Sequence, residues 1–412
     1  MSDTQSFVHL LLVLAAVLIT TRASSVLAEK FGQPAILGEL LGGIVLGASV
    51  LGILDPSDLA IHTLAQLGLL ILLFEIGLAT DLRALTKVGG TATVVALVGV
   101  LLPFVIGYLA LSAMGIGRLA AIVCAAALTA TSIGVSTRVL AELGFLQTEE
   151  GTVVLGAAVL DDIVGLVILS VIGSFAAGVA ITATGIARTS AVAFGFVAIA
   201  IIVGSFVVPP LFHAAKRLRS PTTIAVMGLA FAFFLAALAG MLGSAIIVGG
   251  FVAGVLLNRI DQRDDVQRSA GAMGSLLTPI FFASVGASVD LRALAEPRTL
   301  LITLVLLAAG AIGKIIAAYA PIWFKGNKAL IGTAMLPRGE VELIVAQTGL
   351  AIGALDTSLF GAITLMVLLT TLLSPPLIQA VAKRDPRAGQ LLPAKAGGFG
   401  PIELRSESES DT

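Results

Sequence analysis

The segment LGAAVLDDIVGLVILS, residues 155–170, places two acidic residues in the middle of an apolar stretch. Asp161 and Asp162 are the only charged residues between Glu150 and Arg188, a length sufficient for a helix to cross a bilayer. A carboxylate at the centre of such a helix costs about 2.5–3.5 kcal/mol on insertion scales, so intramembrane acids usually mark an ion or proton path. A structural ion pair that joins two helices is the alternative that these residues leave open.

The composition predicts an all-α polytopic membrane protein. Of the 412 residues, 58% are hydrophobic and only 12% are charged, and the mean hydropathy is +1.07. A soluble fold of this length could not bury so much apolar surface. The net charge of −1 gives no basic surface for nucleic acid, and the single cysteine, Cys124, excludes an intrachain disulfide and a cysteine-based metal site.

The lengths of the apolar segments, and the Gly, Pro and charged residues that separate them, predict about thirteen membrane spans. They run approximately from 6 to 22, 36 to 53, 61 to 79, 91 to 112, 119 to 139, 151 to 176, 189 to 212, 222 to 240, 244 to 258, 271 to 289, 299 to 323, 327 to 350 and 357 to 381. With the N-terminus outside, the cytoplasmic loops and tail carry eighteen Lys and Arg residues and the external loops carry four. The positive-inside rule therefore favours an external N-terminus and a cytoplasmic C-terminus.

An internal repeat relates the two halves of the chain. IGLATDLRAL (76–85) recurs as VGASVDLRAL (285–294), and GGIVLGASVL (42–51) resembles GGFVAGVLLN (249–258). Both matches are offset by seven predicted spans. Because seven is odd, the copies face opposite ways across the membrane, which is the inverted-topology repeat of secondary transporters.

The same repeat pairs two polar interruptions of apolar helices, ALTATSIG (127–134) and LPRGEVEL (336–343). Paired discontinuous helices at corresponding positions indicate a binding site near the membrane midplane, because freed backbone groups are tolerated only where they line a polar cavity. Arg338 and Glu340 in the second interruption either lie on the ion path or neutralise the ends of the broken helices. We favour the second interpretation because the interruption needs local charge compensation.

Four motifs in order resemble the bacterial sodium/proton antiporters of monovalent cation:proton antiporter family 2, the second branch of the cation:proton antiporter superfamily. They are ATSIGVSTRVLAELG, LDDIVGLVIL, the lysine of AIGKII, and PRGEVELIVA, and the resemblance covers residues 6 to 381. It implies the sodium/proton antiporter fold with two crossing discontinuous helices. It also implies a homodimer in the inner (plasma) membrane.

The resemblance implies one transporter domain over residues 1–382. A dimerising scaffold would comprise helices at about 6–79 and 222–289, and a mobile ion-translocating core those at about 91–176 and 299–381, with a linker helix at about 189–212. Residues 383–412 are polar and end in SESESDT. We expect them to form a short, disordered cytoplasmic tail.

Carried over to this sequence, the resemblance implies Asp162 as the site where Na⁺ or Li⁺ competes with protons, and Asp161 as the partner of Lys314. Successive helical residues point about 100° apart, so the two carboxylates can serve different neighbours. Hydroxyl or carbonyl oxygens near Thr129, Thr131 and Ser132 are the expected further ligands. Whether Lys314 also releases a proton, which would make exchange electrogenic, or only braces Asp161, stays open.

Two rival transport functions remain. A K⁺/H⁺ antiporter of the same fold is the nearest, although K⁺-exporting relatives often carry a large soluble domain for which the tail is too short. A sodium-coupled solute symporter is less favoured because nothing marks a second cavity. We expect no enzyme activity and no cofactor. The expected partners are monovalent cations, protons, the lipid bilayer and a second copy of the chain, but no nucleic acid.

Overall fold

The computed structural model describes residues 3–80, 82–176, 183–216, 221–242, 246–288 and 296–388, and within these ranges the regular structure is entirely helical. The described helices are α1 Asp3–Lys30, α2 Ala35–Leu46, α3 Leu59–Ala79, α4 Leu82–Lys87, α5 Gly89–Ala113, α6 Arg118–Ala126, α7 Ile133–Glu142, α8 Glu149–Ala176, α9 Ala183–Lys216, α10 Pro221–Met241, α11 Ile246–Leu257, α12 Arg263–Ala287, α13 Pro297–Tyr319, α14 Lys328–Ala334, α15 Glu340–Ala351 and α16 Thr357–Ala382.

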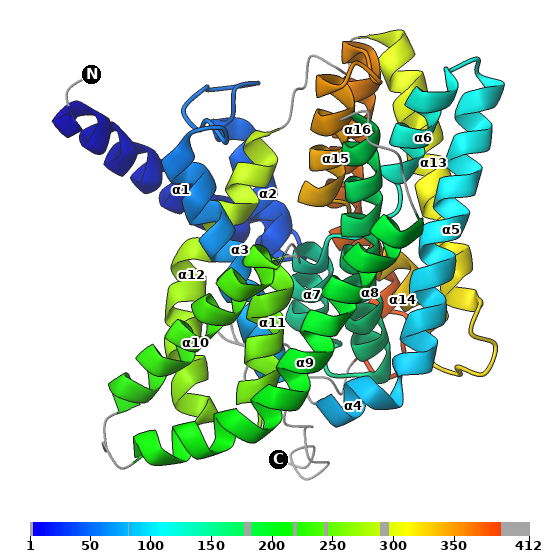
Figure 1. Ribbon diagram of the computed structural model, residues 1–412. Coiled ribbons are helices and arrows are strands. Elements are labelled where there is room, and N and C mark those ends of the chain that lie inside the picture. Colours follow the sequence, from blue (N-terminus) through cyan, green and yellow to red (C-terminus); the bar gives the residue numbers. More distant parts are fainter. Residues whose placement is uncertain are drawn as a thin grey trace.

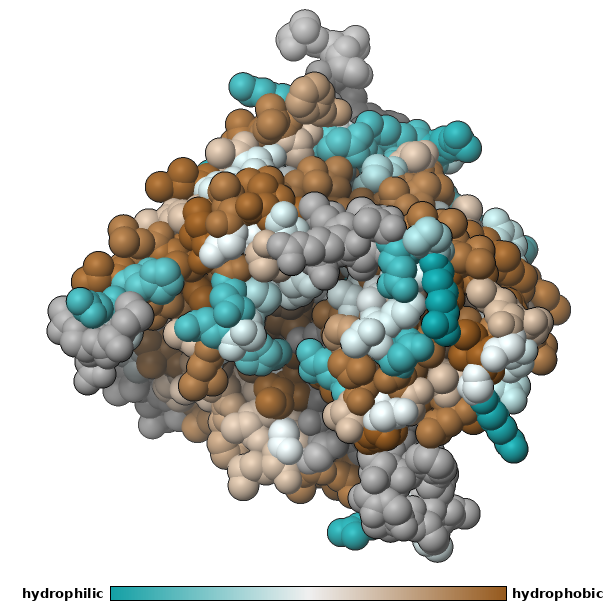
Figure 2. Space-filling model, turned by 90° about the horizontal axis from the view of Figure 1, so that it is seen from above, coloured by the Kyte–Doolittle hydropathy of each residue, from teal (hydrophilic) through white to brown (hydrophobic). Residues whose placement is uncertain are grey.

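Eight of the described helices are long and apolar enough to cross a membrane, namely α1, α3, α5, α9, α10, α12, α13 and α16. Helices α2 and α11 are shorter apolar segments. Figure 2 shows hydrophobic side chains over much of the visible surface and out to its rim, with hydrophilic side chains gathered in patches. The polytopic, all-α membrane fold is therefore confirmed, while the number of thirteen spans stays a prediction.

The ends of two helices differ from the predicted spans. Helix α1 continues past the predicted end at Arg22 to Lys30, because a charged residue does not itself end a helix. The helix ends before Gly32, whose φ of 67° is a conformation that favours glycine. Helix α2 ends at Leu46, several residues before the predicted end near 53. Gly47 follows it as the C-cap, in an extended conformation.

The helices form two groups (Figure 1). Helices α1, α2, α3, α10, α11 and α12 pack on one another, and helices α5, α6, α8, α13, α14, α15 and α16 form the second group. Helix α7 packs on α8 and α16 and also reaches α2 and α3, while α9 contacts both α8 and α11. We call the first set the scaffold group and the second set, with α7, the core group. That the core group moves stays a prediction.

Glycines allow very close packing of α3 against α11 inside the scaffold group. A Cβ atom at Gly77 of α3 would collide with the carbonyl oxygen of Phe251, and one at Gly254 of α11 would collide with that of Phe74. Helices in membranes associate through such small residues because lipid offers no hydrophobic drive between them.

The equivalent helices of the other repeat copy pack in the same way. A Cβ atom at Gly286 of α12 would collide with the carbonyl oxygen of Leu40 in α2, and one at Gly43 would collide with Ala283. Gly77 and Gly286 occupy the same position of the two repeat copies. These reciprocal contacts support the internal repeat. Its inverted orientation stays a prediction, since residues 289–295 of the second copy lie outside the described residues.

The first residues of the predicted tail are structured. Arg387 donates to Glu150 at the start of α8 (2.7 Å) and also to Asp385, and the backbone N–H of Asn327 donates to the same Glu150 oxygen (2.8 Å). The Arg387 side chain lowers the pKa of Asp385 by hydrogen bonding to its charged form. The prediction of disorder from residue 383 was therefore wrong for residues 383–388, and residues 389–412 lie outside the described part.

The close packing can be tested with two glycine substitutions. We expect Gly254→Ala to lower the thermal unfolding temperature in detergent, because overpacking costs about 1–3 kcal/mol. Gly90→Ala in α5 is the matched control, since nothing lies within 4 Å of its added Cβ. An unfolding temperature of Gly254→Ala equal to that of the control would contradict this packing.

Candidate ion site at the crossing of two broken helices

Two apolar helices are interrupted at the predicted places, and the interruptions contact each other. Residues 127–132 separate α6 from α7, and residues 335–339 separate α14 from α15. The backbone N–H of Ser132 donates to the carbonyl of Pro337 (2.9 Å), and the Ser136 hydroxyl donates to the carbonyl of Ala334 (2.5 Å). Each broken helix thus satisfies backbone groups of the other, as unpaired backbone in a membrane requires.

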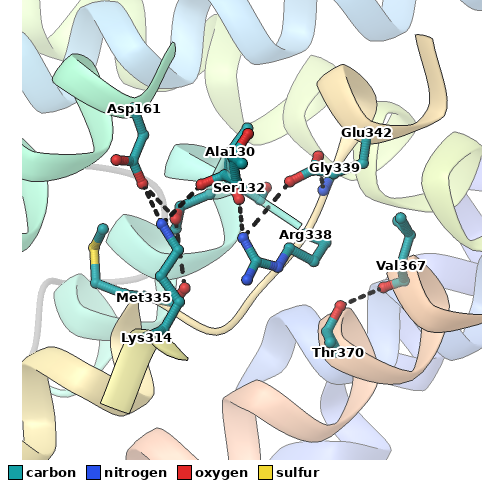
Figure 3. Close-up of polar contacts among 12 residues, drawn as sticks. Ala130, Ser132, Asp161, Lys314, Met335, Arg338, Gly339, Glu342, Val367 and Thr370 are labelled. Carbon is teal, nitrogen blue, oxygen red and sulfur yellow. Dashed lines mark hydrogen bonds and ion pairs between the residues drawn. The ribbon is translucent and has the colours of Figure 1, made fainter. Parts of the chain in front are cut away.

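Asp161 and Lys314 form a completely buried ion pair beside this crossing (Figure 3). The Lys314 Nζ of α13 lies 2.6 Å from the Asp161 Oδ2 of α8, and both side chains are 0% exposed. The same ammonium donates to the carbonyl of Thr129 (2.9 Å), and the hydroxyl of Thr131 donates to Asp161 Oδ2 (2.8 Å). The pair that the sequence resemblance implied is therefore brought together, and it also holds the first helix break.

Arg338 and Glu342 compensate the other ends of the broken helices. The buried Arg338 guanidinium donates to the carbonyl of Ala130, where α6 has ended, and lies 4.0 Å from Glu342 Oε1. Glu342 Oε2 accepts the N–H of Gly339, just before α15 (2.8 Å). A cation at a helix C-terminus and a carboxylate at a helix N-terminus both oppose the helix dipole.

Glu342, rather than the predicted Glu340, is the described carboxylate that caps α15. Glu340 begins the helix, and its side chain lies outside the described part. Three residues after Gly339, Glu342 occupies the position from which an acidic residue reaches back to the helix start. This spacing was visible in the sequence as GEVE, so the cap could have been assigned.

Asp162 lies next to the ion pair and is 3% exposed. On a helix its side chain projects about 100° from that of Asp161. The charged groups described around the crossing are the acids Asp161, Asp162 and Glu342 and the bases Lys314 and Arg338. Buried carboxylates in a membrane interior are the groups that bind protons and monovalent cations.

The hydroxyls predicted as ligands are partly committed to protein contacts. Thr129 donates to the carbonyl of Ala126 (2.8 Å) and Thr131 donates to Asp161, whereas Ser132 meets the opposite helix through its backbone. A donating hydroxyl still has oxygen lone pairs to offer a cation. Among the described residues no cluster of three or more His, Cys, Asp or Glu side chains could hold a metal ion.

A family model described as "Sodium/hydrogen exchanger, transmembrane" matches residues 13–384. This chain belongs to the sodium/hydrogen exchanger family. The exchanger is 34% identical to the high-affinity Na⁺/H⁺ antiporter NhaS3 of Synechocystis sp., over 90% of this chain and 89% of that one. It is 33% identical to the Na⁺/H⁺-K⁺ antiporter GerN of Bacillus cereus, over 89% of this chain and 94% of that one.

Its fold is that of a sodium/proton antiporter. The structure of MjNhaP1 from Methanocaldococcus jannaschii superimposes with a TM-score of 0.67 at 18% sequence identity, covering 93% of this exchanger and 99% of that chain. An Enterococcus hirae Na⁺/H⁺ antiporter is 30% identical over 90% of this exchanger and 98% of that relative. The family and fold implied by the sequence motifs are therefore confirmed.

The contact between Asp161 and Lys314 predicts that substitutions of the two residues have strongly non-additive effects on stability. Asp161→Asn or Lys314→Gln alone leaves a buried charge uncompensated, which costs about 3–5 kcal/mol. We expect each single variant to unfold at a clearly lower temperature in detergent, and the double variant to recover most of that loss. Strictly additive losses in this double-mutant cycle would contradict the pairing.

Proposed function

We propose that this exchanger moves Na⁺ or Li⁺ in one direction and protons in the other, and that the two compete for Asp162. The observation that carries the proposal is the buried Asp162 carboxylate beside the crossing of the two broken helices, in a chain of the sodium/hydrogen exchanger family. The names of the relatives NhaS3 and the Enterococcus hirae antiporter support sodium as the cation. Transport, rather than covalent catalysis, is the activity.

Competition follows from the burial of the site. An ionised carboxylate is unfavourable in the membrane interior unless a positive charge compensates it. A proton or a cation at Asp162 supplies that charge, and both would occupy the same carboxylate oxygens. Binding of one therefore expels the other, which links the two fluxes.

The cation would be held by the Asp162 carboxylate, oxygens of the adjacent break and water. Hard cations such as Na⁺ prefer oxygen ligands, and a helix interruption provides carbonyls that no longer belong to a helix. We assign neutral ligands to the Thr131 and Ser132 segment. The carbonyl of Thr129 is less suited because it accepts a bond from Lys314.

Alternating access would come from movement of the core group against the scaffold group, with α9 as the linker. The crossing lies entirely in the core group, so such a movement would carry the site as a unit. We propose that the scaffold group forms a homodimer in the inner membrane. The N-terminus would lie outside and the C-terminus in the cytoplasm.

Transport by Asp162→Asn tests the proposal. In proteoliposomes with a pH-sensitive dye, we expect the wild type to exchange protons for Na⁺ and Li⁺, and the variant to lose at least about 90% of the rate because no carboxylate remains to exchange charge. Glu149→Gln is the matched control, because this carboxylate on the same helix is 60% exposed and far from the crossing.

The same assay is repeated with K⁺, because the relative GerN is named a Na⁺/H⁺-K⁺ antiporter. Exchange driven by K⁺ but not by Na⁺ or Li⁺ would overturn the sodium assignment. Exchange retained by Asp162→Asn would overturn the site.

We further propose that Lys314 is a brace and not a second proton carrier, because loss of its proton would leave the buried carboxylate of Asp161 without its compensating charge. The double variant Asp161→Asn with Lys314→Gln should then carry the same current per transported Na⁺ as the wild type. A current that is present in the wild type and lost in the double variant would assign a second proton to Lys314.

A further inference from the structure

A second, largely buried group of charged residues lies where α7 contacts the scaffold group. It consists of Arg138 and Glu142 of α7, Glu39 of α2 and Glu75 of α3. Arg22 and Glu29 of α1 also act electrostatically on Glu39. Arg138 lies within α7, and its side chain is only 22% exposed.

The carboxylate of Glu142 joins the two groups directly. Its Oε1 accepts from Arg138 Nε (2.8 Å), and its Oε2 accepts the backbone N–H of Ala35 (3.0 Å). Ala35 is the first residue of α2, where N–H groups have no partner within the helix. A core-group carboxylate thus caps a scaffold helix, at the end where the helix dipole attracts negative charge.

The scaffold group supplies the charges that attract Arg138. Glu39 and Glu75 are 5% and 4% exposed, and each has one carboxylate oxygen without a hydrogen-bond partner in the described structure. Gly274 of α12 makes room for Glu75, since a Cβ there would lie 2.6 Å from its Oε1. Both glutamates are near enough to act electrostatically on Arg138, and the hydrogen bond from Ala35 to Glu142 is the direct contact between the groups.

Closer to the crossing, the contact between α7 and the scaffold group is apolar. At Gly134 an added Cβ would meet Leu69, Leu72 and Phe281. Apolar contacts are not directional and change little when one surface slides over another. The hydrogen bond from Ala35 to Glu142 is directional, and it must break if α7 moves along α2.

We propose that Glu142, positioned by Arg138, is a latch that holds the core group to α2 in this conformation and so sets how much of the protein occupies it. The proposal rests on the alternating movement proposed above. Glu142 is nine residues from the start of α7, about 14 Å along the helix from the crossing. It therefore does not touch the ion, and its removal changes the equilibrium between conformations rather than the intrinsic affinity.

Loss of the latch and loss of an ion ligand have different effects on the apparent KM for Na⁺. The apparent KM for Na⁺ on each side of the membrane depends on the fraction of protein open to that side. Weakening the latch therefore raises the apparent KM on the side to which this conformation opens and lowers it on the other. Loss of a ligand would raise both, and a folding defect would lower only the maximal rate.

The experiment measures the apparent KM for Na⁺ in everted and in right-side-out membrane vesicles. We expect Glu142→Ala to shift the two values in opposite directions, by about tenfold in their ratio, since a hydrogen bond to a charged group supports at least that factor. The isosteric Glu142→Gln keeps an acceptor for Ala35 but loses the charge. Its shift should have the same sign and be smaller.

The matched control is Asp265→Asn, which removes the exposed ion pair with Arg268 inside α12 alone and should leave both KM values unchanged. If Glu142→Ala does not fold, opposite shifts of the two KM values in Glu142→Gln support the latch. Parallel shifts, or no shift in a folded Glu142→Gln protein, would overturn the latch and leave the proposed exchange standing. Absence of Na⁺-driven or Li⁺-driven exchange in the wild type would overturn the function itself.

Discussion

The ion pair between Lys314 and Asp161 joins α13 to α8 at a point where neither side chain touches solvent. An isolated charge at that depth would be very unfavourable, so each residue requires the other. The ammonium also holds the Thr129 carbonyl, and the carboxylate also holds the Thr131 hydroxyl. One buried pair thus fixes two intact helices and the interruption between α6 and α7. The geometry of the crossing depends on it.

The second interruption is stabilised in a related way, with Arg338 at the carbonyl end of one broken helix and Glu342 at the amide end of another. These two charges and the Asp161–Lys314 pair cancel. Asp162 is a further buried carboxylate beside these pairs. In the proposed function, the paired charges maintain the architecture and Asp162 binds the mobile proton or cation.

Several elements could be predicted from the sequence because they violate the composition of an apolar helix. The adjacent aspartates, the buried lysine and the two polar interruptions each stand out against a membrane background, and the structure brings them together. The equivalence of Gly77 and Gly286 in the two repeat copies likewise corresponds to equivalent close contacts. These features are local in sequence, or repeat at a constant offset.

Other features depended on partners distant in sequence. Glu39 and Glu75, which act electrostatically on Arg138, lie on helices far from it in sequence. The cap of α2 comes from Glu142, which is 107 residues away, and the end of α1 is determined by a glycine in a left-handed conformation rather than by a charge. The order imposed on residues 383–388 by Glu150 also has no local signature.

The central claim is that Na⁺ and a proton compete for Asp162, and proton release on cation binding tests it most directly. Purified exchanger in weakly buffered detergent solution is titrated with NaCl while the pH is recorded, with choline chloride as the ionic-strength control. The account predicts release of about one proton per chain on Na⁺ binding, and no release from Asp162→Asn. If Na⁺ binds to the wild type without proton release at every pH at which exchange occurs, the account is contradicted.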